Sequence, residues 1–239
     1  MPFITSLSSQ FGYGQAQKQQ IVSPTNLLLY LDAGNRRSYP GSGTTWTDLS
    51  ANTNNATALT GVTYNSANGG YLTFNGAGSG SLVSSKYNTT YTGKTIFITG
   101  NMTSIASGAF RAMIGSSSGS RNFNTYMYSP ASNRYQIHYS AGGQGGFSSD
   151  LSYTPGNWFT TAVTHTTGGT VSYYFNGSLV NTATGVTFSQ YSSPSTELVG
   201  AADNYWLGPL SVIAVYKSAL TAADVLALHN SVKGRYGLS

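Results

Sequence analysis

Hydrophobic and polar positions alternate with a period of two over much of the chain, as expected for half-buried β-strands. Clusters of Gly, Asn and Ser separate these runs and predict turns. The run at residues 26–32 is instead continuously apolar, which predicts a strand buried on both faces. The predicted strands lie at residues 26–32, 71–76, 94–102, 110–116, 123–129, 134–140, 157–166 and 209–217.

A β-hairpin is predicted at residues 171–183. Two runs rich in β-branched and aromatic residues flank the dipeptide Asn176-Gly177. This dipeptide fits a type I′ turn because both of its positions take positive φ angles. The two runs should therefore pair directly through a two-residue loop.

The hydrophobic period changes to that of a helix at residues 220–234. Thr221 and Asp224 have the spacing of a capping box, with Asp in place of the usual Glu. Gly234 is expected to end the helix. We expect a single short helix packed on the outside of the β-structure, with an apolar face made of Val225, Leu228, His229 and Val232.

The composition supports an all-β domain. Among 239 residues, only 7% are charged, whereas Gly (29) and Tyr (18) are abundant, a mixture that does not suit helix surfaces. We expect one all-β sandwich at residues 25–239. Residues 1–24 are rich in Gln, Ser and Gly and are interpreted as an extended N-terminal arm, either a poorly ordered terminus or a tether that docks on a neighbouring subunit.

The net charge of +5 does not point to nucleic acid as a partner. Lysines and arginines are scattered along the chain, and the only adjacent pair is Arg36–Arg37, whereas phosphate-binding surfaces cluster such residues. No apolar run is long enough to span a membrane, and the start of the chain does not read as a signal peptide. The chain has no cysteine, which excludes thiolate metal sites and thiol nucleophiles, and we expect no cofactor.

The few acidic residues argue against catalysis. Asp32 and Asp48 flank a loop rich in Gly, Ser and Pro, but both stand in turn contexts, and we expect both to stabilise turns. No two acids have the close sequence spacing of a glycosidase motif, and the three histidines are dispersed. A calcium site at Asp203 and Asn204 is disfavoured, since Ca²⁺ usually needs more than one carboxylate. We expect no enzymatic activity and no metal site.

One pair of predicted strands suggests a binding surface. Alternation places Arg134, Gln136 and His138 on one face of their strand, and Tyr126 and Tyr128 on one face of the preceding strand. If the two strands are neighbours, guanidinium, amide and aromatic groups share a surface that suits sugar rings and hydroxyls. The alternative is that these are simply the outward polar residues of a half-exposed sheet.

Two stretches of the chain resemble a known family. The stretch "LLLYLDAGNRRSYPGSGTTWTDLS" with "YLTFNG", and the stretch "LVGAADNYWLGPLSVIAVYKSALTAADVLALHNSVKGRYG", resemble the laminin-G-like, concanavalin A-like domains of tailed-bacteriophage virion proteins. The resemblance covers roughly residues 26–238. It implies an antiparallel jelly-roll sandwich of two sheets, which the alternating strands favour independently. The clustered acidic motif of the glucan-hydrolysing members and the acid-rich metal loop of the lectin members are both absent.

The resemblance implies a function outside catalysis. We expect a non-enzymatic structural protein on the virion surface, as a capsid decoration or a fibre or adhesion component, fixed partly by its arm. Its partners would be other virion structural proteins, and it would form a homo-oligomer. The alternative is a carbohydrate-binding module that recognises host-surface glycans through Tyr126, Tyr128, Arg134, Gln136 and His138.

Overall fold

The computed structural model describes residues 21–83, 91–116, 124–141, 144–187, 196–200 and 205–239. Most of the predicted arm and the Asp203–Asn204 pair lie outside these residues. From the arm, Val22 is buried and Pro24 begins a short 3-10 helix. The elements in chain order are η1 (Pro24–Asn26), β1 (Leu27–Asp32), β2 (Ala56–Asn65), η2 (Ala67–Gly69), β3 (Tyr71–Val83), β4 (Gly93–Asn101), β5 (Phe110–Ser116), β6 (Asn124–Tyr128), β7 (Gln136–Ala141), β8 (Gln144–Phe147), β9 (Trp158–Thr166), β10 (Val171–Phe175), β11 (Ser178–Ala183), β12 (Thr196–Val199), β13 (Leu207–Tyr216) and α1 (Ala222–Tyr236).

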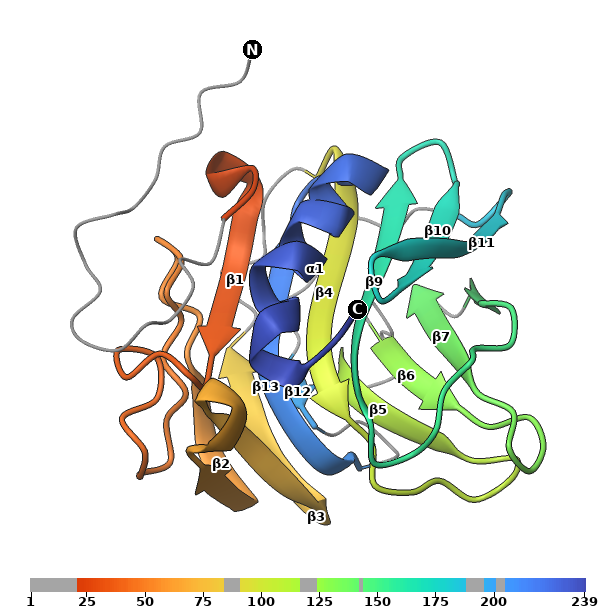
Figure 1. Ribbon diagram of the computed structural model, residues 1–239. Helices are drawn as coiled ribbons and strands as arrows, with labels where there is room; N and C mark the ends of the chain where they lie inside the picture. Colours follow the sequence, from red (N-terminus) through yellow and green to blue (C-terminus); the bar gives the residue numbers. More distant parts are fainter. Residues whose placement is uncertain (1–20, 84–90, 117–123, 142–143, 188–195, 201–204) are drawn as a thin grey trace.

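The strands form two antiparallel sheets packed as a sandwich, which confirms the predicted fold class (Figure 1). The first sheet has the order β11-β10-β9-β4-β13, with β1 also paired to β13. The second has the order β12-β5-β6-β7-β8. The long strand β3 pairs with β13 near its start and with β12 near its end, so it joins the two sheets, and β2 pairs with β3.

The eight predicted strands and the predicted hairpin are all present. β1 is buried along its whole length, as its continuous apolar run predicted. At the hairpin, Asn176 and Gly177 both have positive φ, 47° and 77°, and Phe175 pairs with Ser178. A Cβ on Gly177 would lie 3.0 Å from the ring of His229, so close packing as well as φ requires glycine there. Strands β2, β8 and β12 were not predicted from the sequence.

The main hydrophobic core lies between the two sheets. The first sheet contributes inward side chains that include Ile96, Ile98, Phe159 and Ile213, and the second contributes Met113, Met127, Ile137 and Tyr139. Trp46 and Trp206 are fully buried in the same core. Because alternate residues of β5, β6 and β7 enter this core, the intervening residues must face outward. The outer face of the second sheet is therefore free to carry a site.

A second hydrophobic cluster lies between α1 and the outer face of the first sheet. Val225, Leu228 and Val232 of the helix pack with residues such as Phe97, Val212 and Ala214. Thr221 caps the helix, and its capping box with Asp224 is confirmed. Within the described residues, no helix has the length and hydrophobicity needed to cross a membrane.

The prediction that the helix ends at Gly234 is wrong. The helix continues to Tyr236 and is capped by Gly237, which has a φ of 64° and donates its backbone N–H to Lys233 O. The last turn is held in place because Arg235 and Tyr236 contact the first sheet. These tertiary contacts offset the cost of about 1 kcal/mol of a glycine inside a helix.

Candidate functional site

The structure brings four of the five predicted site residues onto one surface. β6 and β7 are neighbouring strands, with Tyr126 opposite His138 and Tyr128 opposite Gln136. Their side chains lie on the outer face of the second sheet, because the alternate residues enter the core. Arg134 precedes β7 and lies at the end of this surface. The predicted grouping of these residues is therefore a feature of the fold.

Five rings from four neighbouring strands form what we call the aromatic face: Phe110, Tyr126, Tyr128, His138 and Phe147. The rings of Phe110 and Tyr128 are stacked with centroids 4.3 Å apart, and those of His138 and Phe147 are 4.4 Å apart. Contacts at these distances hold the rings in one arrangement before any ligand arrives. The face is thus a preorganised surface.

The members of the aromatic face differ in their access to solvent. Phe147 is 40% exposed, and Phe110, Tyr128 and His138 are half-buried. Tyr126 is only 5% exposed, and its hydroxyl accepts a hydrogen bond of 2.6 Å from Asn124 Nδ2. Tyr126 therefore supports the other rings from below, and direct contact with a ligand would fall to Phe147, Tyr128 and Phe110.

A charged and polar edge borders the aromatic face. Asp150 accepts hydrogen bonds from Arg134 Nε at 2.6 Å and from Gln136 Nε2 at 2.9 Å. The hydrogen bond from Arg134 lowers the pKa of Asp150, and Asp150 in turn raises the pKa of Arg134. Both side chains of this ion pair are exposed, so the guanidinium group also has N–H donors directed to solvent.

Three residues of this surface, Phe110, Phe147 and Asp150, were not predicted from the sequence. Phe110 and Ala112 alternate outward from the next strand, β5, and this alternation was a usable signal. Phe147 belongs to β8, a four-residue strand whose preceding glycines give no alternation to read. Asp150 follows β8 in a loop, so nothing local linked it to Arg134.

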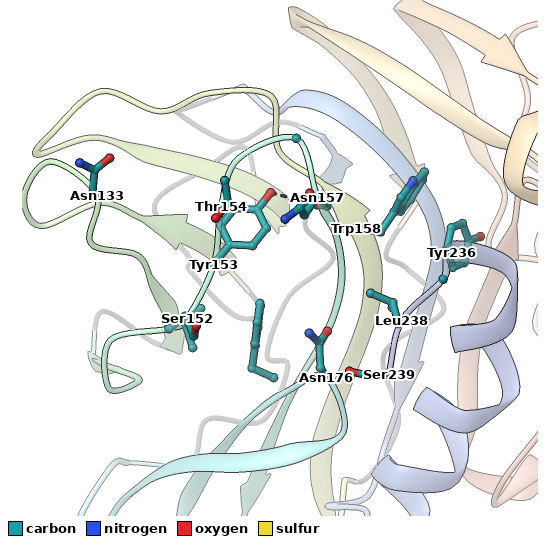
Figure 2. Close-up of a pocket in the computed structure, with 14 residues that line it drawn as sticks. Asn133, Ser152, Tyr153, Thr154, Asn157, Trp158, Asn176, Tyr236, Leu238 and Ser239 are labelled. Atoms are coloured by element: carbon teal, nitrogen blue, oxygen red, sulfur yellow. Dashed lines mark hydrogen bonds between the residues drawn. The ribbon is translucent and has the colours of Figure 1, made fainter.

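A second candidate site is an open groove of about 820 Å³ near the C-terminal end of α1 (Figure 2). One side is the loop at residues 151–157, and the other is the segment at residues 236–239. Trp158 and the hairpin residue Asn176 lie between them, and Asn133 borders the loop side. No part of this groove was predicted, since its walls come from segments far apart in the sequence.

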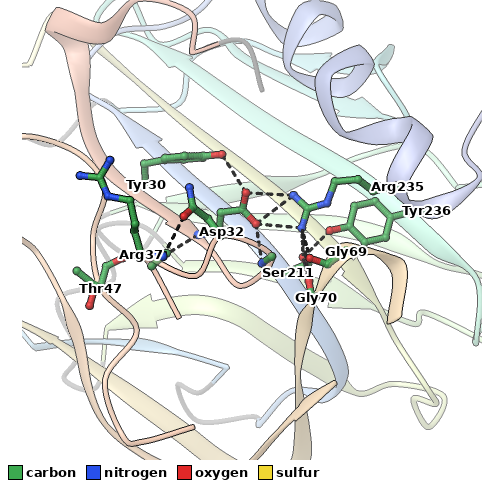
Figure 3. Close-up of polar contacts among 12 residues, drawn as sticks. Tyr30, Asp32, Arg37, Thr47, Gly69, Gly70, Ser211, Arg235 and Tyr236 are labelled. Carbon is green, nitrogen blue, oxygen red and sulfur yellow. Dashed lines mark hydrogen bonds and ion pairs between the residues drawn. The ribbon is translucent and has the colours of Figure 1, made fainter. Parts of the chain in front are cut away.

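Asp32 belongs to a buried network that holds the fold together (Figure 3). Its carboxylate accepts from both terminal guanidinium nitrogens of Arg235, at 3.0–3.1 Å, and from Gly34 N at 2.9 Å. Burial alone would lower the pKa of Arg235, but the neighbouring Asp32 carboxylate raises it. Arg235 also lies 3.4 Å from Ser211 Oγ. The turn at Gly34 was predicted, whereas the ion pair was not.

Asp48 stabilises a turn, as predicted. It is 5% exposed and accepts backbone N–H groups from Tyr30, Ser50 and Asn54, each at 2.8 Å, together with the Ser50 hydroxyl at 2.7 Å. These bonds attach the loop after β1 to the first sheet. Asp32 and Asp48 are both occupied by structural contacts.

Two histidines are buried and hydrogen-bonded. His165 Nδ1 lies 3.2 Å from Tyr139 Oη, and His229 Nδ1 lies 2.7 Å from Thr160 Oγ1. Burial lowers the pKa of both. Across the described residues, no three His, Asp or Glu side chains come together in a way that could hold a metal ion.

Comparison with protein families gives one match. Residues 101–226 match the model of Laminin_G_3, described as the concanavalin A-like lectin/glucanases superfamily. The matched segment runs from the end of β4 into α1 and includes the whole aromatic face. Comparison with curated proteins finds no match.

Several solved structures have a similar fold. Domain 4 of AbnA, an extracellular arabinanase of Geobacillus stearothermophilus solved in complex with arabinotriose, has a TM-score of 0.64 and 14% identity, over 85% of this chain and 98% of that one. A botulinum neurotoxin type C structure, from a study of its interaction with two ganglioside molecules, has a TM-score of 0.65 and 15% identity, over 87% of this chain. The binding domain of botulinum neurotoxin DC, in complex with SialylT, has a TM-score of 0.65 and 16% identity. This chain spans only 52% of each neurotoxin chain.

Proposed function

Because the chain belongs to the concanavalin A-like lectin/glucanases superfamily, we propose that it is a non-enzymatic, lectin-like domain that binds host-surface glycans from the outside of a virion. The proposed contact surface is the aromatic face with its polar edge.

The observation that carries this proposal is the combination of ring faces and hydrogen-bonding groups on one surface. Sugar rings present C–H groups that pack on aromatic faces, and Phe147 and Tyr128 offer such faces at the surface. Sugar hydroxyls accept from guanidinium and amide donors and donate to carboxylates, and Arg134, Gln136 and Asp150 supply these groups alongside.

The similar structures support glycan binding to different degrees. This chain corresponds to nearly the whole of AbnA domain 4, which was solved with a bound trisaccharide, so the likeness extends over an entire sugar-binding unit. In the neurotoxin chains, about half of the length has no counterpart here. The arabinanase domain is therefore the more informative comparison.

The absence of catalysis is part of the proposal. Asp32 and Asp48 are engaged in structural hydrogen bonds, Asp150 is paired with Arg134, and Asp224 caps α1. A glycosidase acting through paired carboxylates needs one acid and one base or nucleophile facing a common sugar. None of these four carboxylates faces another across an open site.

The virion setting rests on the resemblance of both ends of the domain to phage virion proteins. In this setting the domain projects from the head, tail or fibre, and residues 1–24 contact other virion structural proteins. Repeated placement around a symmetric particle makes it a homo-oligomer. Many copies would strengthen binding to a host surface even if each site were weak.

A glycan array probed with the multivalent protein tests the binding proposal. We expect binding to be lost in Phe147→Ala and Arg134→Ala and retained in Leu226→Ala, an exposed apolar residue on α1, outside the aromatic face. If Phe147→Ala and Arg134→Ala both retained glycan binding, the aromatic face would not be the binding surface. If the multivalent wild-type protein bound no glycan on the array, the proposal of glycan binding would be overturned.

The virion part needs a separate test. Mass spectrometry and antibody labelling of purified particles should detect the chain on their surface, and deletion of residues 1–24 should release it. Presence on particles without array binding would favour a purely structural decoration role. Absence from particles would overturn the virion setting and leave glycan binding open to the array test.

A further inference from the structure

The groove beside the C-terminal end of α1 has the chemistry of a ligand site. Its volume of about 820 Å³ lies within the range of about 300–1,000 Å³ usual for small-molecule sites. Its polar lining consists of side-chain amides and hydroxyls, from Asn133, Ser152, Thr154, Asn157 and Asn176. Among the described residues that line the groove, none has an Asp, Glu, Lys, Arg or His side chain.

The polar groups of the groove are available to a ligand. In the described part of the structure, the side chains of Asn133, Ser152, Thr154 and Asn157 make no hydrogen bond to the protein. They are exposed to solvent, so water can hydrate them. A ligand rich in hydroxyl groups could replace that water with direct hydrogen bonds.

The loop that carries Ser152, Thr154 and Asn157 is held firmly against the end of β4. The Tyr153 hydroxyl bonds with Met102 N at 3.0 Å and with Asn157 O at 3.2 Å. Gly156 N donates to Met102 O at 2.8 Å, and Asn101 Nδ2 donates to Gly156 O at 2.6 Å. Such contacts reduce the ordering cost of binding.

The far side of the groove is equally well positioned. Asn176 Oδ1 accepts from Thr160 N at 2.9 Å, which fixes the amide and leaves its Nδ2 donors for a ligand. The ring of Trp158 contacts those of Tyr236 and Tyr71, with ring centroids 4.3 Å and 5.3 Å apart, and these contacts hold it in position. Trp158 is half-buried, so part of its ring borders the groove and can pack against the C–H face of a sugar.

We infer that this groove binds a short neutral oligosaccharide. An anionic sugar or a phosphate would lose hydration there without gaining a positive counter-charge, because no cationic side chain is among the described lining residues. Burial raises the pKa of Tyr153 and of Tyr236 to about 12, so both phenols remain uncharged at ordinary pH. The groove is separate from the aromatic face, and the inference does not depend on glycan binding there.

Tryptophan fluorescence isolates this site from the rest of the molecule. The chain has three tryptophans, of which Trp46 and Trp206 are fully buried. A saccharide that enters the groove should therefore change the emission of Trp158, whereas a ligand on the aromatic face should not. Titration with arabinotriose and with neutral array hits, at low and high salt, provides the measurement.

We expect a saturable emission change that is independent of salt. Binding should weaken about tenfold in Asn157→Ala, the loss of one or two hydrogen bonds. The emission change should vanish in Trp158→Phe, whose folding is checked by urea unfolding. Asn230→Ala, at an exposed asparagine on α1, should leave the affinity unchanged.

Three results would overturn the inference. One is the absence of an emission change with every neutral saccharide up to millimolar concentration. The second is binding that Arg134→Ala abolishes and Asn157→Ala leaves intact, which would assign the glycan to the aromatic face alone. The third is selective binding of sialylated saccharides that weakens with salt.

Discussion

Two arginine–aspartate pairs occupy contrasting places in this protein. The side chains of Arg235 and Asp32 retain 15% and 9% of their exposure, and those of Arg134 and Asp150 retain 55% and 41%. The buried pair joins the last turn of α1 to the end of β1, 203 residues away along the chain. The exposed pair borders the aromatic face of the second sheet.

The same ion-pair chemistry therefore has two different consequences. In the buried pair, Arg235 and Asp32 are shielded from water, so each charge is stabilised mainly by the other. Loss of one side chain leaves an uncompensated buried charge. In the exposed pair, water solvates both Arg134 and Asp150, so the pair contributes little to the free energy of folding. The N–H donors of Arg134 can then bind a ligand. Asp32 therefore has a structural role in the first sheet. The aromatic face, whose chemistry suits ligand recognition, lies on the second sheet.

The largest effect is expected from breaking the buried pair. Arg235→Ala should lower the free energy of unfolding by about 3–5 kcal/mol, because Asp32 would remain buried without its partner. Urea unfolding measures the change. The double variant Asp32→Asn/Arg235→Met should recover part of the loss. A loss in Arg235→Ala no larger than that of an ordinary surface substitution would contradict the structural role of the pair.

A smaller loss is expected at Asp48, which is buried but has no charged partner in the described structure. Asp48→Ala should cost about 2–3 kcal/mol, because the backbone N–H groups of Tyr30 and Asn54 would lose their acceptor. Asp48→Asn retains one acceptor oxygen and should cost less. A stability of Asp48→Ala equal to that of the wild type would show that the hydrogen bonds of this turn contribute nothing to folding.

Mildly acidic pH should lower the stability of the fold through the buried histidines and leave the exposed Arg134–Asp150 pair intact. The pKa values of His165 and His229 lie below their ordinary 6.5, so under mildly acidic conditions the unfolded chain binds more protons than the folded one. The free energy of unfolding should therefore fall as the pH drops below about 6.5. Asp150 has a lowered pKa, so its contribution is lost only at pH values below its ordinary 3.8.

Urea unfolding from neutral pH to about pH 5 tests this ordering. His229→Gln should reduce the slope of stability against pH in this range, and Asp150→Asn should leave the slope unchanged. A slope that Asp150→Asn removes would assign the acid sensitivity to the exposed pair.

The smallest effect on folding is expected at the exposed pair itself. Arg134→Ala should leave the midpoint of urea unfolding within error of the wild type, because both charged groups are already in water. The same variant should lose glycan binding on the array. A clear drop in stability would show that the pair is structural, like its buried counterpart.

Much of the fold could be predicted because its signals are local. Alternation identified the strands, Asn176-Gly177 identified the hairpin, and Thr221 with Asp224 identified the start of α1. The predicted end of α1 was wrong, because contacts of Arg235 and Tyr236 with the first sheet stabilise the helix beyond Gly234. β8 and β12 were missed because they are only four residues long, and β2 because register shifts interrupt its alternation.

The candidate sites divide in the same way. The sequence alone determined that Tyr128, Gln136 and His138 would share a surface if their strands were neighbours, because side-chain direction in a strand follows from residue parity. Only the tertiary structure decided that the strands are neighbours, that Tyr126 is buried, and that Phe147 and Asp150 join them. It also decided the Asp32–Arg235 pair and the groove around Trp158, because both unite segments whose proximity no local pattern encodes.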